Sequence, residues 1–350
     1  MMKAVRLELF TQSIPETGHA ERLALRAEAG GWDGISLTDS QNLVGDPFVA
    51  MALGAKVTEH LQFMTGVTNP ATRHPAALAT AIATVQEVSG GRAVLGIGRG
   101  DTALFHLGRP PMPTEDFFAR IREVHAYLGG ETIDLRGHPS RLRWLDRASQ
   151  PTVPVDIAAS GPKVIAFAAR TVERVTFAVG ADPQRLSWAL DLARTAMRDA
   201  GRSDVDVSFG AYVNVGCHPD LTAARNLIRG TIAAFAHFSA MPGSTGAGLS
   251  ASDREVVAEV GRRYDSNRHL SNAADHSTVL PDAFVERFAV VGDANVCARR
   301  LLELSSLGLE RLVITGPTID ADPTNARVHH QLVANELLPA LRSGSAEARR

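Results

Sequence analysis

Residues 61–101 constrain the fold of this chain more than any other segment. An apolar run at 61–67 precedes a Thr-Asn-Pro turn, a helical pattern over about 74–88 and a second apolar run at 93–97. This order predicts a βαβ unit, in which the two strands are parallel. Small and polar residues stand where each strand ends, and parallel α/β folds bind their ligands at that edge.

Short apolar runs alternate with helical patterns over most of the remaining chain. We expect further strands at 5–10, 34–38, 153–158, 175–179, 205–215 and 311–315, with helices between them. Alternation of this length favours a (β/α)8 TIM barrel over an open sheet, formed as one domain over residues 1–350.

Two stretches interrupt the alternation. Residues 129–154 are too long for a simple barrel loop and predict a small inserted hairpin. Residues 241–280 are rich in Gly, Ser, Asn and His, which favours a lid in the second half of the barrel.

Composition excludes several classes of function. A net charge of −2, a pI near 6.6 and 5% aromatic residues give no basis for nucleic-acid binding. The sequence holds neither an apolar run of membrane length nor a signal peptide, so we expect a cytoplasmic protein without membrane contact. Cys217 and Cys297 lack metal or redox spacing and are expected to be buried thiols. The histidines show no metal-ligand spacing either.

The segment GVTNPATRHPAALATAIATVQEVSGGRAVLGIGRGD, residues 66–101, resembles the luciferase-like superfamily of flavin- and deazaflavin-dependent oxidoreductases. Within it, the segment is most similar to the methylenetetrahydromethanopterin reductase branch. The resemblance implies a TIM barrel with an insertion in its second half, a small-molecule substrate and a homodimer or larger homo-oligomer. It also implies coenzyme F420 as cofactor, with FMN as the alternative.

The resemblance assigns a cofactor contact to Asp39, which follows the strand expected at 34–38. Deazaflavin-dependent relatives usually carry His at the next position, where this chain has Ser40, so a His base is not expected there. The structural alternative is that Asp39 caps the turn or helix that follows, although a carboxylate at the C-terminal end of a strand faces the pocket in either case.

The residues after the strand at 61–67 are expected to support the cofactor ring. By resemblance, Gly66 and Val67 form a bulge behind the ring, with or without a non-prolyl cis peptide. Asn69 is placed to hydrogen-bond the pyrimidine edge or the ribityl chain. His74 precedes Pro75 at a helix start, so it is either a helix cap or a proton-transfer group.

Gly98, Arg99 and Asp101 follow the strand at 93–97. Related enzymes place a Glu at the position of Asp101 as proton donor or substrate contact. Asp101 is therefore the candidate catalytic residue, together with Asp39, and Gly98 and Arg99 are candidate cofactor contacts. A salt bridge between neighbours, or a helix cap at Asp101, is the structural alternative.

A second loop is expected to bind the phosphate of the cofactor. Ala159, Ser160 and Gly161 follow a strand and open a helix, whose first N–H groups and dipole favour an anion. The family uses an equivalent segment for the phosphate-bearing tail. Lys163 adds charge unless it points to solvent, and Gly180 lies after the next strand on the same edge.

Through this resemblance, these residues imply a coenzyme F420-dependent oxidoreductase that transfers a hydride between the deazaflavin and a small organic substrate. An FMN-dependent monooxygenase using reduced flavin and oxygen is the alternative within the same fold. A non-catalytic relative that only binds cofactor or ligand is an alternative of another class.

Overall fold

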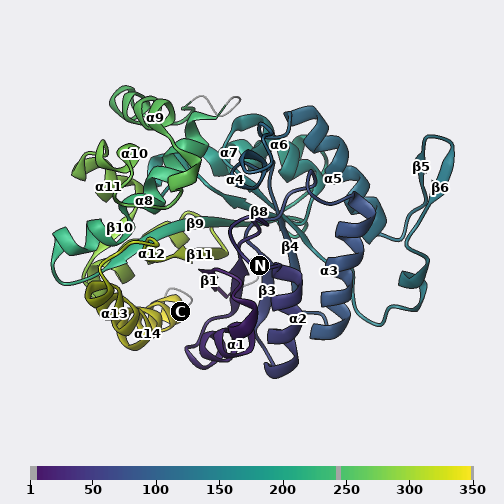
Figure 1. Cartoon of the computed structure of the whole chain (residues 1–350), viewed down its shortest axis with the longest axis horizontal. Coiled ribbons are helices and arrows are strands. Elements are labelled where there is room, and N and C mark those ends of the chain that lie inside the picture. Colours follow the sequence, from purple (N-terminus) through teal and green to yellow (C-terminus); the bar gives the residue numbers. More distant parts are fainter. Residues whose placement is uncertain (1–5, 242–245, 348–350) are drawn as a thin grey trace. The chain divides into compact units, whose positions relative to one another are not determined.

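Parallel strands alternate with helices along the chain (Figure 1). The computed structural model describes residues 6–241 and 246–347. Its barrel strands are β1 (Glu8–Ser13), β2 (Gly34–Leu37), β3 (Gln62–Thr65), β4 (Ala93–Ile97), β7 (Val155–Ala159), β8 (Arg174–Phe177), β9 (Ser208–Cys217) and β11 (Arg311–Thr315).

The strand order identifies the fold. With β10 (Val290–Gly292), the sheet runs β10-β9-β11-β1-β2-β3-β4-β7-β8, and β9 also pairs with β8. This additional pairing closes the parallel strands into the predicted (β/α)8 barrel. The chain divides into two compact units, which are described separately below. The single domain expected from the sequence stays a prediction.

The first strand lies later in the chain than expected. The pattern predicted residues 5–10, whereas β1 spans Glu8–Ser13, and Val5 lies outside the described residues. Pairing sets the position, because Glu8 to Thr11 align with Arg311 to Ile314 of β11.

One unit comprises Gln12–Ala158 and Phe167–Arg174 and carries β2, β3 and β4. Its helical elements are η1 (Thr17–His19), α1 (Ala20–Ala29), α2 (Pro47–Val57), α3 (Pro75–Ser89), α4 (Thr102–Phe105), α5 (Thr114–Leu128) and η2 (Arg143–Arg147). Local chemistry explains where they begin. Asp46 accepts hydrogen bonds from the N–H groups of Phe48 and Val49 at the start of α2, with Pro47 in the first turn.

The insertion at 129–154 contains two short antiparallel strands, β5 (Ile133–Leu135) and β6 (His138–Ser140). Figure 1 shows this hairpin projecting beyond α3 and α5. Gly137 has φ +86°, a left-handed conformation that suits glycine in the turn between the two strands.

The other unit comprises Met1–Thr11, Ala159–Ala166 and Val175–Arg350. Its helical elements are α6 (Pro162–Thr171, which continues into the first unit), α7 (Pro183–Asp199), α8 (Leu221–Ala240), α9 (Ala251–Arg263), η3 (Ser266–Arg268), α10 (Asp275–Thr278), α11 (Asp282–Phe288), α12 (Ala294–Ser306), α13 (Pro323–Leu332), the π-helical turn η4 (Val333–Leu337) and α14 (Leu338–Glu347). Cys217 and Cys297 are buried free thiols, as expected. No helix among the described residues is long and apolar enough to cross a membrane.

The segment expected as a lid is largely helical where it is described. It carries α9, η3 and α10, while residues 242–245 lie outside the described part of the chain. Val257 and Val260 of α9 join a buried cluster with Ile228 and Phe284. The polar composition of this segment concealed the short apolar stripe that docks α9 on its neighbours. Its role as a lid stays a prediction.

Candidate active site

The end of β3 carries the bulge expected from the resemblance. Met64 pairs with Val94 of β4, whereas Thr68 bridges Ile97. The chain thus advances four residues from Met64 to Thr68 while β4 advances three, which is a β-bulge with one extra residue. The Gly66–Val67 peptide is cis. A Cβ atom on Gly66 would lie 1.9 Å from the Oγ of Ser36, so only glycine fits there.

Val67 lies against the next strand end. A Cβ atom on Gly98 would lie 3.0 Å from the Cγ2 of Val67, and the Gly98 N–H donates to the Thr68 carbonyl at 2.9 Å. From β1, Gln12 Nε2 donates to the Gly66 carbonyl at 2.9 Å. The bulge is therefore held by hydrogen bonds from β1 and from the residue that follows β4.

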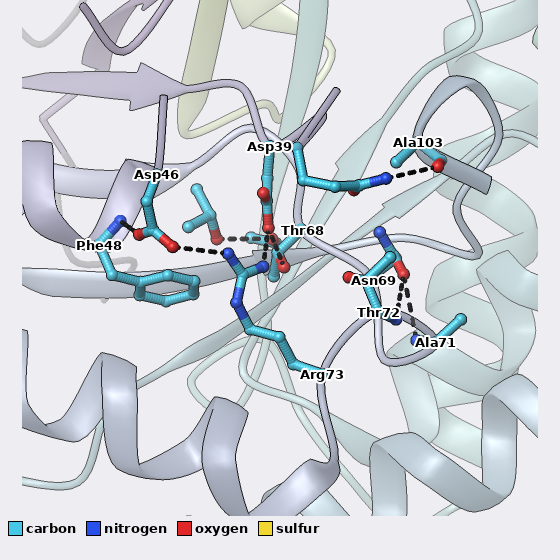
Figure 2. Close-up of polar contacts among 12 residues, drawn as sticks. Asp39, Asp46, Phe48, Thr68, Asn69, Ala71, Thr72, Arg73 and Ala103 are labelled. Carbon is cyan, nitrogen blue, oxygen red and sulfur yellow. Dashed lines mark hydrogen bonds and ion pairs between the residues drawn. The ribbon is translucent and has the colours of Figure 1, made fainter. Parts of the chain in front are cut away.

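Asp39 follows β2 and lies in a buried ion pair (Figure 2). Its Oδ2 accepts a 2.6 Å hydrogen bond from the Thr68 hydroxyl and pairs with the Arg73 guanidinium. Arg73 also donates to Asp46 at 2.9 Å and lies over the Phe48 ring. The cap of α2 is Asp46 rather than Asp39.

The charge of Arg73 is stabilised where it lies. Burial lowers the pKa of the Arg73 guanidinium, but the charge of Asp39 and the hydrogen bonds to Asp39 and Asp46 outweigh burial and raise it. Arg73 therefore stays a cation and fixes the Asp39 carboxylate at the end of β2. Sequence reasoning missed this role, because 34 residues separate the partners and no local pattern links them.

Asn69 shapes the loop that leads from β3 to α3. Its Oδ1 accepts from the N–H groups of Ala71 and Thr72 at 3.1 and 3.0 Å. Figure 2 shows the amide nitrogen of Asn69 pointing away from this turn, which leaves it available to a ligand. His74 caps α3, since its Nδ1 accepts from Ala76 N at 3.2 Å, which is the cap alternative considered for this residue.

Arg99 and Asp101 differ in their surroundings. Arg99 Nε donates to the Met112 carbonyl at 2.8 Å, which ties the guanidinium to the loop before α5. Burial lowers the pKa of Arg99, and the charge of Asp101 partly offsets this effect. Asp101 stands at the N-cap position of α4, but its side chain makes no capping hydrogen bond. The helix-cap alternative for its carboxylate is therefore wrong.

Buried polar atoms near these residues lack protein partners. The hydroxyls of Thr38 and Thr72 and the Nε2 atom of His106 are buried with no hydrogen-bond partner among the described residues. They follow β2, β3 and β4 respectively. Buried polar atoms normally find a partner, so this edge suits a ligand rich in carbonyl and N–H groups, such as the tricyclic cofactor ring. No sequence pattern pointed to Thr38 or His106.

The second expected loop lies in the other unit, after β7. Ala159 is buried, and the Ser160 hydroxyl donates to the Phe238 carbonyl over a long 3.5 Å. The Gly161 carbonyl accepts from Ile165 at 3.0 Å in the first turn of α6. The first N–H groups of a helix have no intrahelical partner, which suits an anion. Lys163 is exposed.

Gly180 follows β8 in the same unit. Its φ is +85°, and a Cβ atom there would lie 2.7 Å from the Phe288 ring. Both the backbone conformation and the close ring restrict this position to glycine.

The structure thus gathers the expected site residues in two groups. Asp39, Gly66, Val67, Asn69, Gly98, Arg99 and Asp101 follow β2, β3 and β4 in one unit, and Ala159, Ser160, Gly161 and Gly180 follow β7 and β8 in the other. Within the described residues, no three His, Cys, Asp or Glu side chains are grouped to hold a metal ion.

Comparison with known proteins gives a consistent result. The family model described as luciferase-like monooxygenase matches residues 5–311. The 5,10-methylenetetrahydromethanopterin reductase of Archaeoglobus fulgidus is 28% identical over 321 residues, covering 90% of this chain and 93% of the relative. An F420-dependent glucose-6-phosphate dehydrogenase of Microbacterium testaceum is 32% identical over 218 residues, covering 55% and 62%.

A solved structure shares the fold. The coenzyme F420-dependent tetrahydromethanopterin reductase of Methanopyrus kandleri superposes with a TM-score of 0.74 at 22% identity, covering 96% of this chain and 99% of that one. The match over residues 5–311 spans most of the barrel, and so the chain belongs to the luciferase-like monooxygenase family of oxidoreductases.

Proposed function

We propose that this protein is a coenzyme F420-dependent oxidoreductase that transfers a hydride between the deazaflavin and a small organic substrate. The observation that carries the proposal is the edge formed after β2, β3 and β4. There the bulge of Gly66 and Val67, the fixed carboxylate of Asp39 and unpartnered polar atoms meet in one unit. Relatives named as F420-dependent enzymes support this cofactor.

In this proposal the protein positions the ring and excludes water. Val67 would support the ring, and the amide nitrogen of Asn69 would donate a hydrogen bond to its polar edge. Asp39, held by Thr68 and Arg73, presents a carboxylate of fixed position. When bound, the deazaflavin supplies the hydride chemistry. Fixed positions matter because small displacements of reacting groups cost much of the rate.

Asp101 is the proposed proton-transfer residue. Its carboxylate is not used to cap α4, and Arg99 beside it is engaged with Met112. Ser40 stands where related enzymes carry His, so another group would have to transfer the proton. Asp101 would donate or accept the proton at the substrate oxygen or nitrogen.

The phosphate-bearing tail of the cofactor is assigned to the other unit. Ala159, Ser160 and Gly161 would bind it at the N-terminus of α6 through backbone N–H groups and the Ser160 hydroxyl. The 3.5 Å hydrogen bond from the Ser160 hydroxyl to the Phe238 carbonyl is weak. The hydroxyl would therefore donate to a charged phosphate oxygen in its place. Gly180 would let the backbone approach the tail closely.

FMN is the alternative cofactor, because the matching family is described as luciferase-like monooxygenase. In that case the protein would use reduced flavin and oxygen on a small molecule. We further expect a cytoplasmic homodimer or larger homo-oligomer that binds no nucleic acid.

Titration with each cofactor tests the proposal. The purified full-length protein is titrated with F420 and with FMN, following cofactor fluorescence. We expect saturable F420 binding that is at least about tenfold tighter than FMN binding, a difference of about 1.4 kcal/mol. Tighter FMN binding would favour the monooxygenase, and no binding of either would refute a cofactor-dependent function.

A further inference from the structure

Arg185 is a cation that the fold buries almost completely. It lies in the first turn of α7 and is 1% exposed. Its Nη1 donates to the Val179 carbonyl at 2.8 Å, and its guanidinium lies 5.5 Å from the centre of the Phe288 ring. Burial lowers the pKa of Arg185 to about 10, although the charges of Asp182 and Asp253 act to raise it, so the side chain stays charged at neutral pH.

Most of the hydrogen-bonding capacity of this guanidinium is unused. Its Nε and Nη2 atoms are buried and have no hydrogen-bond partner among the described residues. An arginine buried for packing alone would normally have its donors satisfied, because each unpaired donor lowers stability. The hydrogen bond that the guanidinium does make is directed at the backbone of residues 178–182, the loop that joins β8 to α7. This loop is therefore the part of the molecule on which Arg185 acts.

The loop 178–182 lies beside the loop to which the cofactor phosphate is assigned. The Ala178 N–H donates to the carbonyl of Ala159, the last residue of β7, at 2.9 Å. Further along, the Ala181 N–H donates to the Phe288 carbonyl at 2.8 Å. Both sides of the loop are thus fixed within this unit, so the peptide between them has a defined position.

One backbone donor in the middle of this loop has no acceptor. Gly180 is buried, and its N–H donates to no described residue. Buried N–H groups rarely stay unpaired, so this one suits an acceptor on a ligand. The Gly180 N–H and the Val179 carbonyl belong to the same peptide unit, which is planar and trans. By holding the carbonyl, Arg185 therefore directs the N–H away from its own guanidinium.

We propose that Arg185 is a positioning residue for the phosphate-bearing tail of the cofactor, because it turns the Gly180 N–H toward that tail. This inference rests on the proposed function, in which Gly180 and the loop after β7 bind the tail. Arg185 does not touch the phosphate; it fixes the donor that does. A donor fixed before binding lowers the cost of ordering the loop when the ligand arrives.

Hydrogen exchange of the wild-type protein tests the donor directly. Exchange of the Gly180 amide is followed by mass spectrometry with electron-transfer fragmentation. The free protein is compared with the protein bound to F420 and to the deazaflavin ring fragment without phosphate. We expect exchange to slow at least about tenfold with F420 and to stay unchanged with the fragment. Equal exchange in the free and F420-bound protein would overturn the inference.

Substitutions at Arg185 test the positioning role. F420 and the ring fragment are titrated against the full-length wild type, Arg185→Met and Arg185→Lys. We expect Arg185→Met to weaken F420 binding about tenfold and fragment binding by less than about twofold, because only the tail needs the Gly180 donor. Arg185→Lys keeps a donor and the charge, so it should restore F420 binding to within about threefold of the wild type.

Arg92→Met is the matched control. Arg92 also donates to backbone carbonyls, those of Leu61 and Ala55 at 2.8 and 2.9 Å, but it precedes β4 and lies outside the proposed site. Its loss should lower the midpoint of thermal unfolding and leave the affinities for F420 and for the fragment unchanged.

The outcomes separate this inference from the proposed function. If the wild type binds F420 but Arg185→Met keeps wild-type affinity, or loses affinity for both ligands equally, Arg185 does not position the tail. A Lys variant that binds F420 as weakly as the Met variant would also overturn the inference. If Arg185→Met fails to fold, the Lys variant and the exchange of the Gly180 amide decide. Failure of the wild type to bind F420 would refute the proposed function itself.

Discussion

Removing Arg73 should expose how much the site depends on its buried ion pair. The side chain of Asp39 is 2% exposed and that of Arg73 21%. Removing one partner of a buried pair costs about 3–5 kcal/mol, because the other charge stays buried without compensation. Water can reach part of the space that Arg73 leaves, so we expect Arg73→Met to lower the free energy of unfolding by about 3 kcal/mol, near the lower limit.

Asp39→Asn should cost less. Arg73 would keep Asp46, which is 46% exposed, and the amide oxygen introduced by the substitution would still accept from the Thr68 hydroxyl. We expect a loss of about 1–2 kcal/mol, typical of one hydrogen bond to a charged group. The double variant should then be more stable than the sum of the single losses predicts, by about 2 kcal/mol.

Urea unfolding of the wild type, both single variants and the double variant measures this cycle. F420 titration of the same proteins tests whether Arg73 positions Asp39 for the cofactor. We expect both single variants to bind F420 more weakly. Losses that add within about 0.5 kcal/mol would refute a coupled pair. Unchanged F420 affinity in Asp39→Asn would remove Asp39 from the cofactor site.

Three further predictions address other residues. Ser160→Asp should weaken binding of F420 but not of a ring fragment without phosphate, because a fixed negative charge would face the phosphate; equal losses for both ligands would show that the loop after β7 is not the phosphate site. Asp101→Asn should keep F420 affinity and lower turnover by about 10²–10⁴-fold; wild-type turnover would exclude Asp101 from proton transfer and favour a binding-only role. His329 is 2% exposed, its Nδ1 accepts from Cys217 N–H, and burial lowers its pKa from 6.5 to about 3. As the pH falls, His329 is therefore protonated in the unfolded state before it is protonated in the folded state. Stability should be full above pH 6.5 and fall by about 1.4 kcal/mol per pH unit toward pH 3. His329→Gln should show a shallower decline in pH-dependent thermal unfolding, and an equal slope would contradict this assignment.

The sequence alone determined the fold class and most of its elements. β4 and β11 have the bounds predicted from the apolar runs, because each run has a clear start and stop. Sequence also placed the expected site residues at strand ends, since small and polar residues interrupt the apolar runs there. The helices of the 241–280 segment escaped prediction, because α9 is stabilised by tertiary contacts of a short apolar stripe.

Only the tertiary structure decided what the polar side chains contact. Arg73 meets Asp39 across 34 residues, and Arg99 Nε donates to the Met112 carbonyl in the loop before α5. It also showed that Asp46, not Asp39, caps α2, and that Gln41 ties the loop after β2 to Ala103 of α4. Periodicity records which face of an element is buried. Pairing between distant side chains depends on how strands and loops meet in space, and no local pattern in the chain carries that information.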